Sequence, residues 1–190
     1  NFKQKDHEIF NKLENISGKI IDGRKNAFPG EVISDFLQEN KNFFPKLEEF
    51  ANQIFDKVKQ NNRTRYIALC QFLKDEYGIT VKDVIPKEGK PFSKIYKVKD
   101  KELLLSDYLS LETKKLFAAA QISQEGASKE IDEYLTTFNF PTEESKKLTR
   151  VALLNYCGAA ILMPYSLFHK ECKELKYDLE LLQNTFATSF

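Results

Sequence analysis

The chain has 190 residues, 42% of them hydrophobic and 30% charged, and its formal net charge is +1. This length suits one substantial domain or two small ones, and a core of that size needs no disulfide or metal to stabilise it. A net charge so close to zero excludes the basic stripe by which a domain usually binds DNA, so we expect no DNA binding by this chain alone.

The cysteines and the N-terminal segment indicate the compartment. Cys70, Cys157 and Cys172 are far apart and form no C-x-x-C pair, which predicts buried thiols in a reducing compartment and argues against a zinc ribbon or a disulfide framework. The first ten residues are polar and charged, unlike a secretory signal. We therefore expect a cytoplasmic protein. The chain also starts without Met, and we expect it to be a fragment of a longer protein.

The first part of the chain is predicted to be helical. Residues 6–21 carry apolar side chains at helical spacing, and "DGRKNAFPG" (22–30) has the composition of a linker. Three more amphipathic helices are predicted around residues 32–37, 47–58 and 66–73, and Gly78 is expected to end the last of them.

The pattern then changes to that of strands. "GITVKDVI" (78–85) is short, rich in β-branched residues and bounded by Gly78 and Pro86. "KIYKV" (94–98) and "ELLLSDYL" (102–109) flank "KDK" and predict a hairpin. A small sheet of about three strands is therefore expected.

Four helices are predicted after the hairpin. "SLETKKLFAAAQISQ" opens with Ser110 as N-cap, and "FPTEESKKLTRVALL" opens in the same way with Thr142, followed by Glu143 and Glu144. The whole pattern predicts an α+β fold that is mostly helical, with helices flanking a small three-stranded sheet.

Residues 151–168, "VALLNYCGAAILMPYSLF", carry no charge. A membrane span needs about 20 predominantly apolar residues, whereas this run contains Asn155, Gly158 and Pro164, and the proline would break the helix. We therefore predict a buried core helix followed by a shorter one, and no membrane contact.

Few residues could carry catalysis or hold a metal. The only histidines, His7 and His169, lie in different predicted helices, and neither has a ligand-spaced neighbour except Cys172. A metal shared by His169 and Cys172 stays open as a minor alternative. The chain has no G-x-S-x-G elbow, P-loop or Rossmann fingerprint. We predict no catalytic residue, no metal site and no cofactor.

Polar residues inside apolar helices are the remaining candidates. A buried amide without a partner costs about 1–3 kcal/mol, so each must meet a protein group, a water or a ligand. Structural networks in the core and the lining of a ligand pocket are both compatible with this pattern. The predicted ligand-binding residues are Phe117, Ala120, Gln121, Gln124, Asn155, Tyr156 and Tyr165.

Two segments resemble known families. "NYCGAAILMPYSLF" (155–168) resembles the N-x-F-A-A-x-L-L-M-P segment of the ImmA/IrrE metallopeptidase-like family, with Cys157 and Gly158 in place of the family Phe and first Ala. "ECKELKYDLELLQNTFATSF" (171–190) resembles a region of the XRE-type short-chain fatty-acyl (ScfR-type) transcriptional regulators. The resemblance covers roughly residues 30–190 and implies a zincin-like core.

The resemblance also implies that the metal motif is lost. The H-E-x-x-H positions fall on Ala120, Gln121, Ile122, Ser123 and Gln124, and residues 151–154 offer no acid as third ligand. Alanine cannot bind a metal, and a glutamine amide has no basic site to take a proton from water. A peptidase is therefore not expected.

By the same resemblance, residues 1–25 follow an absent DNA-binding helix-turn-helix domain. Residues 26–190 form a sensing domain whose C-terminal helical part spans about 140–190. The implied ligand is a short-chain acyl-CoA, DNA is bound only through the absent domain, and a homodimer is expected. The alternatives are a metal-free protein-interaction or dimerisation domain and, less favoured, a metallopeptidase.

Overall fold

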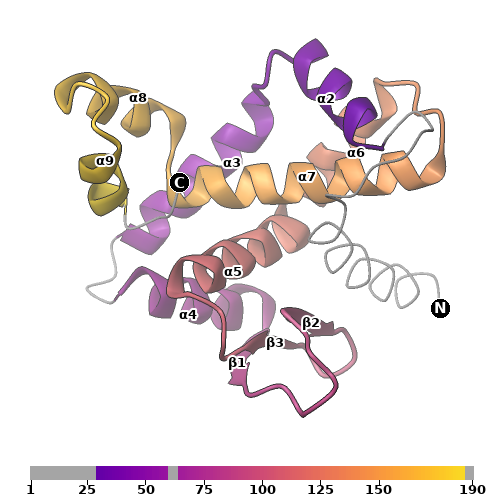
Figure 1. Cartoon of the computed structure of the whole chain (residues 1–190), viewed down its shortest axis with the longest axis vertical. Coiled ribbons are helices and arrows are strands. Elements are labelled where there is room, and N and C mark those ends of the chain that lie inside the picture. Colours follow the sequence, from indigo (N-terminus) through magenta and orange to yellow (C-terminus); the bar gives the residue numbers. More distant parts are fainter. Residues whose placement is uncertain (1–28, 60–63, 187–190) are drawn as a thin grey trace.

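The computed structural model describes residues 29–59 and 64–186 of the chain. The helix predicted over residues 6–21 and nearly all of the linker lie outside this part. Within it the chain forms eight helices and three strands (Figure 1): α2 Pro29–Glu39, α3 Pro45–Lys59, α4 Arg65–Tyr77, β1 Thr80–Val84, β2 Lys94–Lys97, β3 Glu102–Ser106, α5 Leu111–Gly126, α6 Ser128–Thr136, α7 Glu143–Leu162, α8 Tyr165–Glu174 and α9 Leu179–Phe186.

The predicted fold class is confirmed. β2 and β3 form the expected antiparallel hairpin, and β1 pairs in parallel with β3, so β3 lies in the middle of a mixed three-stranded sheet. Five helices follow the sheet, whereas the sequence predicts four.

The additional helix arises from a break in the chain between α5 and α6. α5 ends at Gly126, where a Cβ would lie 2.5 Å from the hydroxyl of Tyr77 and 2.6 Å from the ring of Phe50. Ala127, at φ −114° and ψ 14°, separates it from α6, for which the sequence patterns named no separate helix.

The predicted helix ends are also confirmed. The Ser110 hydroxyl accepts a hydrogen bond from the amide of Thr113 at 3.2 Å, and Thr142 forms a capping box with Ser145. Gly78 ends α4 at φ 70°, a left-handed conformation that favours glycine.

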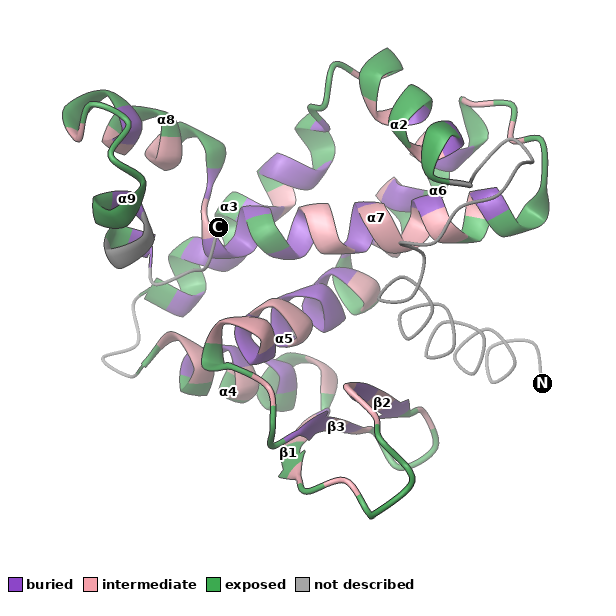
Figure 2. Cartoon of the chain, viewed as in Figure 1, coloured by how far each residue is buried: buried purple, intermediate pink, exposed green. Residues whose placement is uncertain are grey.

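α7 is the central helix of the fold. It packs against α2, α3, α5 and α6, and nine of its residues are buried (Figure 2). The prediction of a buried core helix followed by a shorter helix over the uncharged run is thus confirmed. In the described residues no single helix is long and apolar enough to cross a membrane; α7 and α8 meet the length and composition test only as a pair, bent by 57°.

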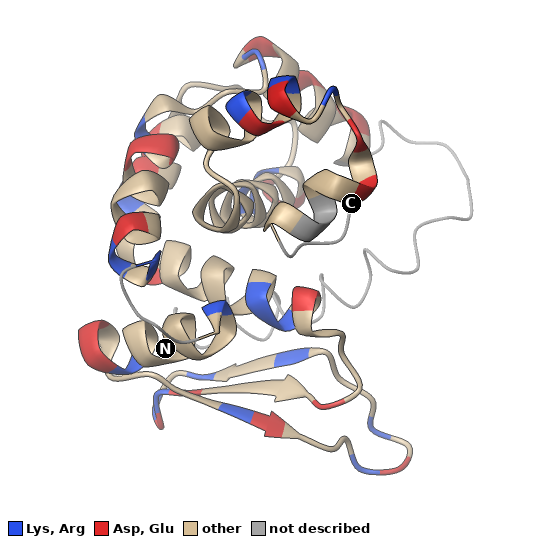
Figure 3. Ribbon diagram, turned by 90° about the vertical axis from the view of Figure 1, so that its left-hand side faces the viewer, with Lys and Arg blue, Asp and Glu red and all other residues tan. Residues whose placement is uncertain are grey.

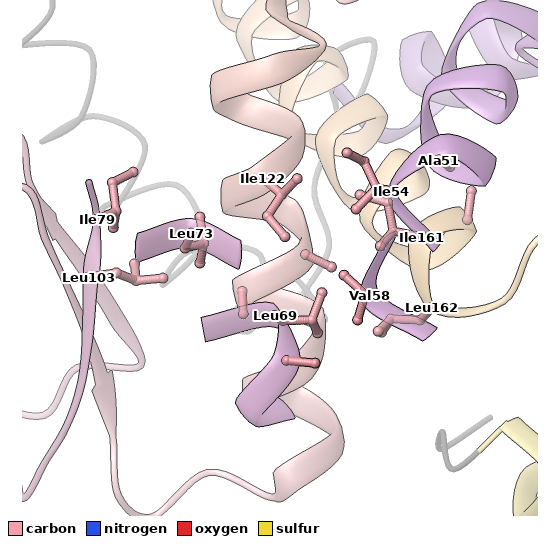
Figure 4. Close-up of a cluster of buried hydrophobic side chains, with 14 of the residues drawn as sticks. Ala51, Ile54, Val58, Leu69, Leu73, Ile79, Leu103, Ile122, Ile161 and Leu162 are labelled. Carbon is pink, nitrogen blue, oxygen red and sulfur yellow. The ribbon is translucent and has the colours of Figure 1, made fainter. Parts of the chain in front are cut away.

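Two hydrophobic clusters lie along α7, one at its end and one at its middle. The larger one joins α3, α4, α5, the sheet and the end of α7, and includes Leu69, Leu73, Ile122 and Ile161 (Figure 4). The second joins α2, α3, α6 and the middle of α7 around Phe36 and Phe44. The sheet lies beyond α4 and α5, on the side away from α7 (Figure 3). In the same view acidic and basic residues alternate along the outer helices.

Two of the three cysteines are buried, as expected, and Cys70 is half-buried. Burial raises the pKa of the Cys70 thiol to about 11 and that of Cys157 to about 12, so both thiols stay protonated at neutral pH. They therefore behave as small apolar side chains.

Candidate functional site

α5 and α7 come into close contact where Gly158 meets Ala120. A Cβ added to Gly158 would lie 2.9 Å from the backbone nitrogen of Ala120 and 3.1 Å from its Cα. Both residues are buried. The two helices are therefore in backbone contact at this point, and the sequence allows it because "AAA" (118–120) faces "CGAA" (157–160).

The order of contacts shows how the two helices run. Gly158 meets Ala120, and Cys157, the residue before it, shares a hydrogen bond with Ser123, three residues further along α5. The helices are therefore antiparallel. Asn155 lies one turn before Gly158, and Gln124 lies one turn after Ala120. In an antiparallel pair of helices we therefore expect Asn155 and Gln124 at the same height along the two axes.

Gln121 takes part in a polar chain that reaches the sheet. Its side chain is only 3% exposed, and its amide donates to a carboxylate oxygen of Glu125 at 2.9 Å. Burial first, and then the charge and hydrogen bond of Glu125, raise the pKa of Tyr96 on β2 to about 12. The Gln121 amide is thus held by a carboxylate that also interacts with β2.

Phe117 and Gln124 are half-buried on α5. The Phe117 ring packs against the larger hydrophobic cluster and has the amine of Lys94 5.1 Å from its centroid. The main-chain carbonyl of Gln124 accepts a hydrogen bond from the hydroxyl of Ser128.

Asn155 carries a buried polar atom without a partner. Its side-chain oxygen has almost no solvent-accessible surface, and no hydrogen-bond donor reaches it from the described residues. Leaving a buried acceptor unpaired costs about 1–3 kcal/mol. A ligand or water with an N–H or O–H group could recover that free energy.

Tyr156 faces α3. Its hydroxyl donates to Glu48 at 2.5 Å and accepts from the amide of Phe44 at 3.4 Å, and its ring packs edge-on against Phe44. Burial first, and then Glu48, raise the pKa of Tyr156, so its hydroxyl remains a donor. No sequence pattern pointed to Glu48, which is 8% exposed in spite of its charge.

Tyr165 lies on the surface at the start of α8, 55% exposed. It stacks on His169 with ring centroids 5.9 Å apart and contacts Phe43 at 5.7 Å. The structure therefore places Ala120 at the contact between α5 and α7, whereas Tyr156 and Tyr165 contact other elements.

The described residues contain no group of three or more His, Cys, Asp or Glu side chains that could hold a metal ion. Cys172 is buried in a cluster with Leu182 and Phe186, whereas His169 is exposed beside Tyr165. The alternative of a metal shared by these two residues gains no further ligand from this part of the chain.

The sequence of this fold matches a known domain family. Residues 74–190 match the IrrE N-terminal-like domain family (peptidase family M78), and the chain belongs to it. Its relatives include HTH-type transcriptional regulators of Mycobacterium tuberculosis. PrpR is 27% identical over 164 residues, covering 85% of this chain and 33% of that protein. RamB is 25% identical over 164 residues, covering 86% and 34%.

A solved structure has the same fold. A Mycobacterium tuberculosis transcriptional regulator superimposes with a TM-score of 0.77 at 27% identity, covering 85% of this chain and 49% of that one. The present chain thus spans about a third of the length of these curated relatives.

Proposed function

We propose that this chain is the ligand-sensing domain of a bacterial transcription regulator, that it responds to a short-chain acyl-CoA, and that it has lost the peptidase chemistry of its family. In this proposal residues 26–190 form the sensing domain, the protein acts as a homodimer in the cytoplasm, and DNA is bound only by a separate helix-turn-helix domain.

The observation that carries the proposal is the content of α5. By the resemblance of the sequence to the family, this helix would carry the metal motif, yet it presents Ala120, Gln121 and Gln124, and α7 offers no acid over residues 151–154. None of these side chains can hold zinc or activate water. Ala120 also lies against the backbone of α7. The names of the relatives support a regulatory role.

The unpaired oxygen of Asn155 supports ligand binding beside this helix pair. It is a buried acceptor level with Gln124, and a coenzyme A thioester carries two amide N–H groups in its pantetheine arm that could donate to it. Gln121, held by Glu125, and Phe117, beside Lys94, lie one turn apart on the part of α5 that faces β2, and in this proposal they extend the site around α5 toward the sheet.

A thermal-shift panel tests the proposal with acetyl-, propionyl-, butyryl- and free coenzyme A. Saturating ligand adds about 2–3 kcal/mol of stability, which raises the melting temperature by several degrees at this size. We expect a shift with one acyl-CoA and none with free coenzyme A. No shift with any of them would contradict acyl-CoA sensing and favour the alternative, a protein-interaction or dimerisation domain.

Gln121→Leu locates the site within the same assay. We expect this variant to keep its melting temperature and lose most of the ligand-induced shift. The matched control is Gln71→Leu, because Gln71 donates to Asp75 across the same four-residue spacing but lies exposed on α4. If Gln121→Leu unfolds the domain, Gln121 belongs to a structural network and the proposed pocket is wrong at this residue.

A further inference from the structure

The two C-terminal helices have a hydrophobic core of their own. We call residues 164–186 the C-terminal arm. Its core consists of Cys172, Leu182 and Phe186, and the rings of Phe168 and Phe186 lie 5.8 Å apart. The partly buried residues around this core are Met163, Leu167, Phe168 and Leu175. None of these residues belongs to either of the two main clusters.

A short junction joins the arm to the rest of the fold. α7 ends at Leu162 and α8 begins at Tyr165, and the two helices are bent by 57°. Met163 has a non-helical backbone at φ −144° and ψ 78°, and Pro164 has no amide hydrogen with which to continue the helix. The backbone can therefore change direction over two residues without disturbing either helix.

One side chain links the arm to the body. Arg65, at the start of α4, donates from a single guanidinium nitrogen to the carbonyl of Leu162 at 2.7 Å and to that of Phe186 at 3.4 Å. Its guanidinium also lies 5.3 Å from the ring centroid of Phe55 on α3. The two carbonyls belong to the last residues of α7 and α9, where a positive charge is favourable.

The other contact between arm and body that we identify is on the surface. Tyr165 and Phe43 meet edge to face, and both are more than two-fifths exposed. An exposed aromatic contact is weak compared with a buried cluster. Arg65 therefore makes the hydrogen bond that ties the end of α9 to the body.

We propose that the C-terminal arm is hinged at Met163–Pro164 and that Arg65 latches it to the body of the domain. Opening breaks the bond from Arg65 to Phe186 and frees the end of α9, so that α9 loosens from α8 and uncovers Cys172, while α3, α4, α5 and α7 keep their packing. The domain thereby has two conformations that a ligand or a neighbouring domain can select. The latch and the hinge work in the same way whatever the ligand is.

Cys172 reports the opening, because it is buried in the arm and becomes reactive only when the arm moves or unfolds. In a chain whose other cysteines are replaced (Cys70→Ser, Cys157→Ala), we compare the rate of thiol modification with and without Arg65→Gln. We expect an increase of about tenfold or more, because a hydrogen bond from a charged group is lost. The matched control is Arg150→Gln, since Arg150 is also half-buried and ties α7 to Asp132 and Ser128 of α6. It should change the rate less than about twofold, because it makes no contact with the arm.

A second reporter separates arm opening from unfolding of the whole domain. In a chain that keeps only Cys157, which lies in the body, Arg65→Gln should leave the rate of modification unchanged. Equal rates for Cys172 with and without Arg65→Gln would overturn the latch. So would a parallel rise at Cys157, which would mean that the whole domain loosens. If Arg65→Gln does not fold, Arg65→Lys serves in its place, because lysine keeps the charge without the guanidinium geometry.

Discussion

At the scale of single residues, the hydrogen bond of Tyr156 explains why the central helix α7 contains a partly buried tyrosine hydroxyl. The carboxylate of Glu48 is almost fully buried, and a buried charge is costly unless hydrogen bonds satisfy it. Tyr156 supplies such a bond from α7 across to α3. Tyr156 of the uncharged run therefore stabilises the carboxyl group of Glu48, which lies in α3.

Removing this hydroxyl should be costly. Tyr156→Phe leaves the ring in place and deprives Glu48 of a donor, so we expect the free energy of unfolding to fall by about 1–3 kcal/mol. Denaturant unfolding followed by far-ultraviolet circular dichroism measures the loss.

Tyr134 offers a matched control for this substitution. Its ring also packs edge-on against Phe44, and its hydroxyl accepts from the amide of Lys46, but it has no buried carboxylate to satisfy. Tyr134→Phe should therefore cost well under about 1 kcal/mol. Equal losses for the two variants would mean that Glu48 does not depend on Tyr156.

At the scale of elements, the contact between α5 and α7 depends on small residues. Glycine is favoured at position 158, because a Cβ there would press on the backbone of Ala120 and push the helices apart.

The substitution Gly158→Ala tests this contact. Overpacking costs about 1–3 kcal/mol, against a gain of up to ~1 kcal/mol from the higher helix propensity of alanine, so we expect a net loss of stability. Gly30→Ala is the control, since Gly30 lies in α2, where an added Cβ would meet nothing within 4 Å, and this variant should be neutral or slightly more stable. A Gly158→Ala variant as stable as Gly30→Ala would show that the helices do not approach this closely.

Local sequence patterns predicted where helices and strands lie better than they predicted which of these elements pair or pack together. Ser110, Thr142 and Gly78 marked helix ends because capping depends on residues next to each other in the chain. The parallel pairing of β1 with β3 and the burial of Glu48 depend on contacts between distant segments, which no local pattern specifies.

The same limit applies to the candidate site. Helical spacing identified Asn155 and Tyr156 as polar residues of a buried helix, but adjacent residues on a helix point about 100° apart. Tyr156 consequently faces α3, whereas Asn155 lies on the side of Gly158. The helix that packs against each side of α7 is known only from the fold, in which α3 and α5 both contact α7.

At the scale of the whole molecule, the chain belongs to the IrrE N-terminal-like domain family, and we propose that alanine and glutamine stand at the positions of the family's metal ligands. The part of its relatives that it matches is about a third of their length, and they are named as transcriptional regulators. We propose that ligand binding occurs beside the contact between α5 and α7 and that movement occurs in the C-terminal arm.

The central claim is that this fold persists here without its metal centre, and zinc content tests it most directly. The chain is expressed in zinc-supplemented medium, purified without an affinity tag or chelator, dialysed, and subjected to elemental analysis. We predict far less than one zinc per chain and no loss of melting temperature on adding EDTA. One zinc per chain that survives dialysis, with destabilisation by EDTA, would contradict the account and point to a metal site built from other residues.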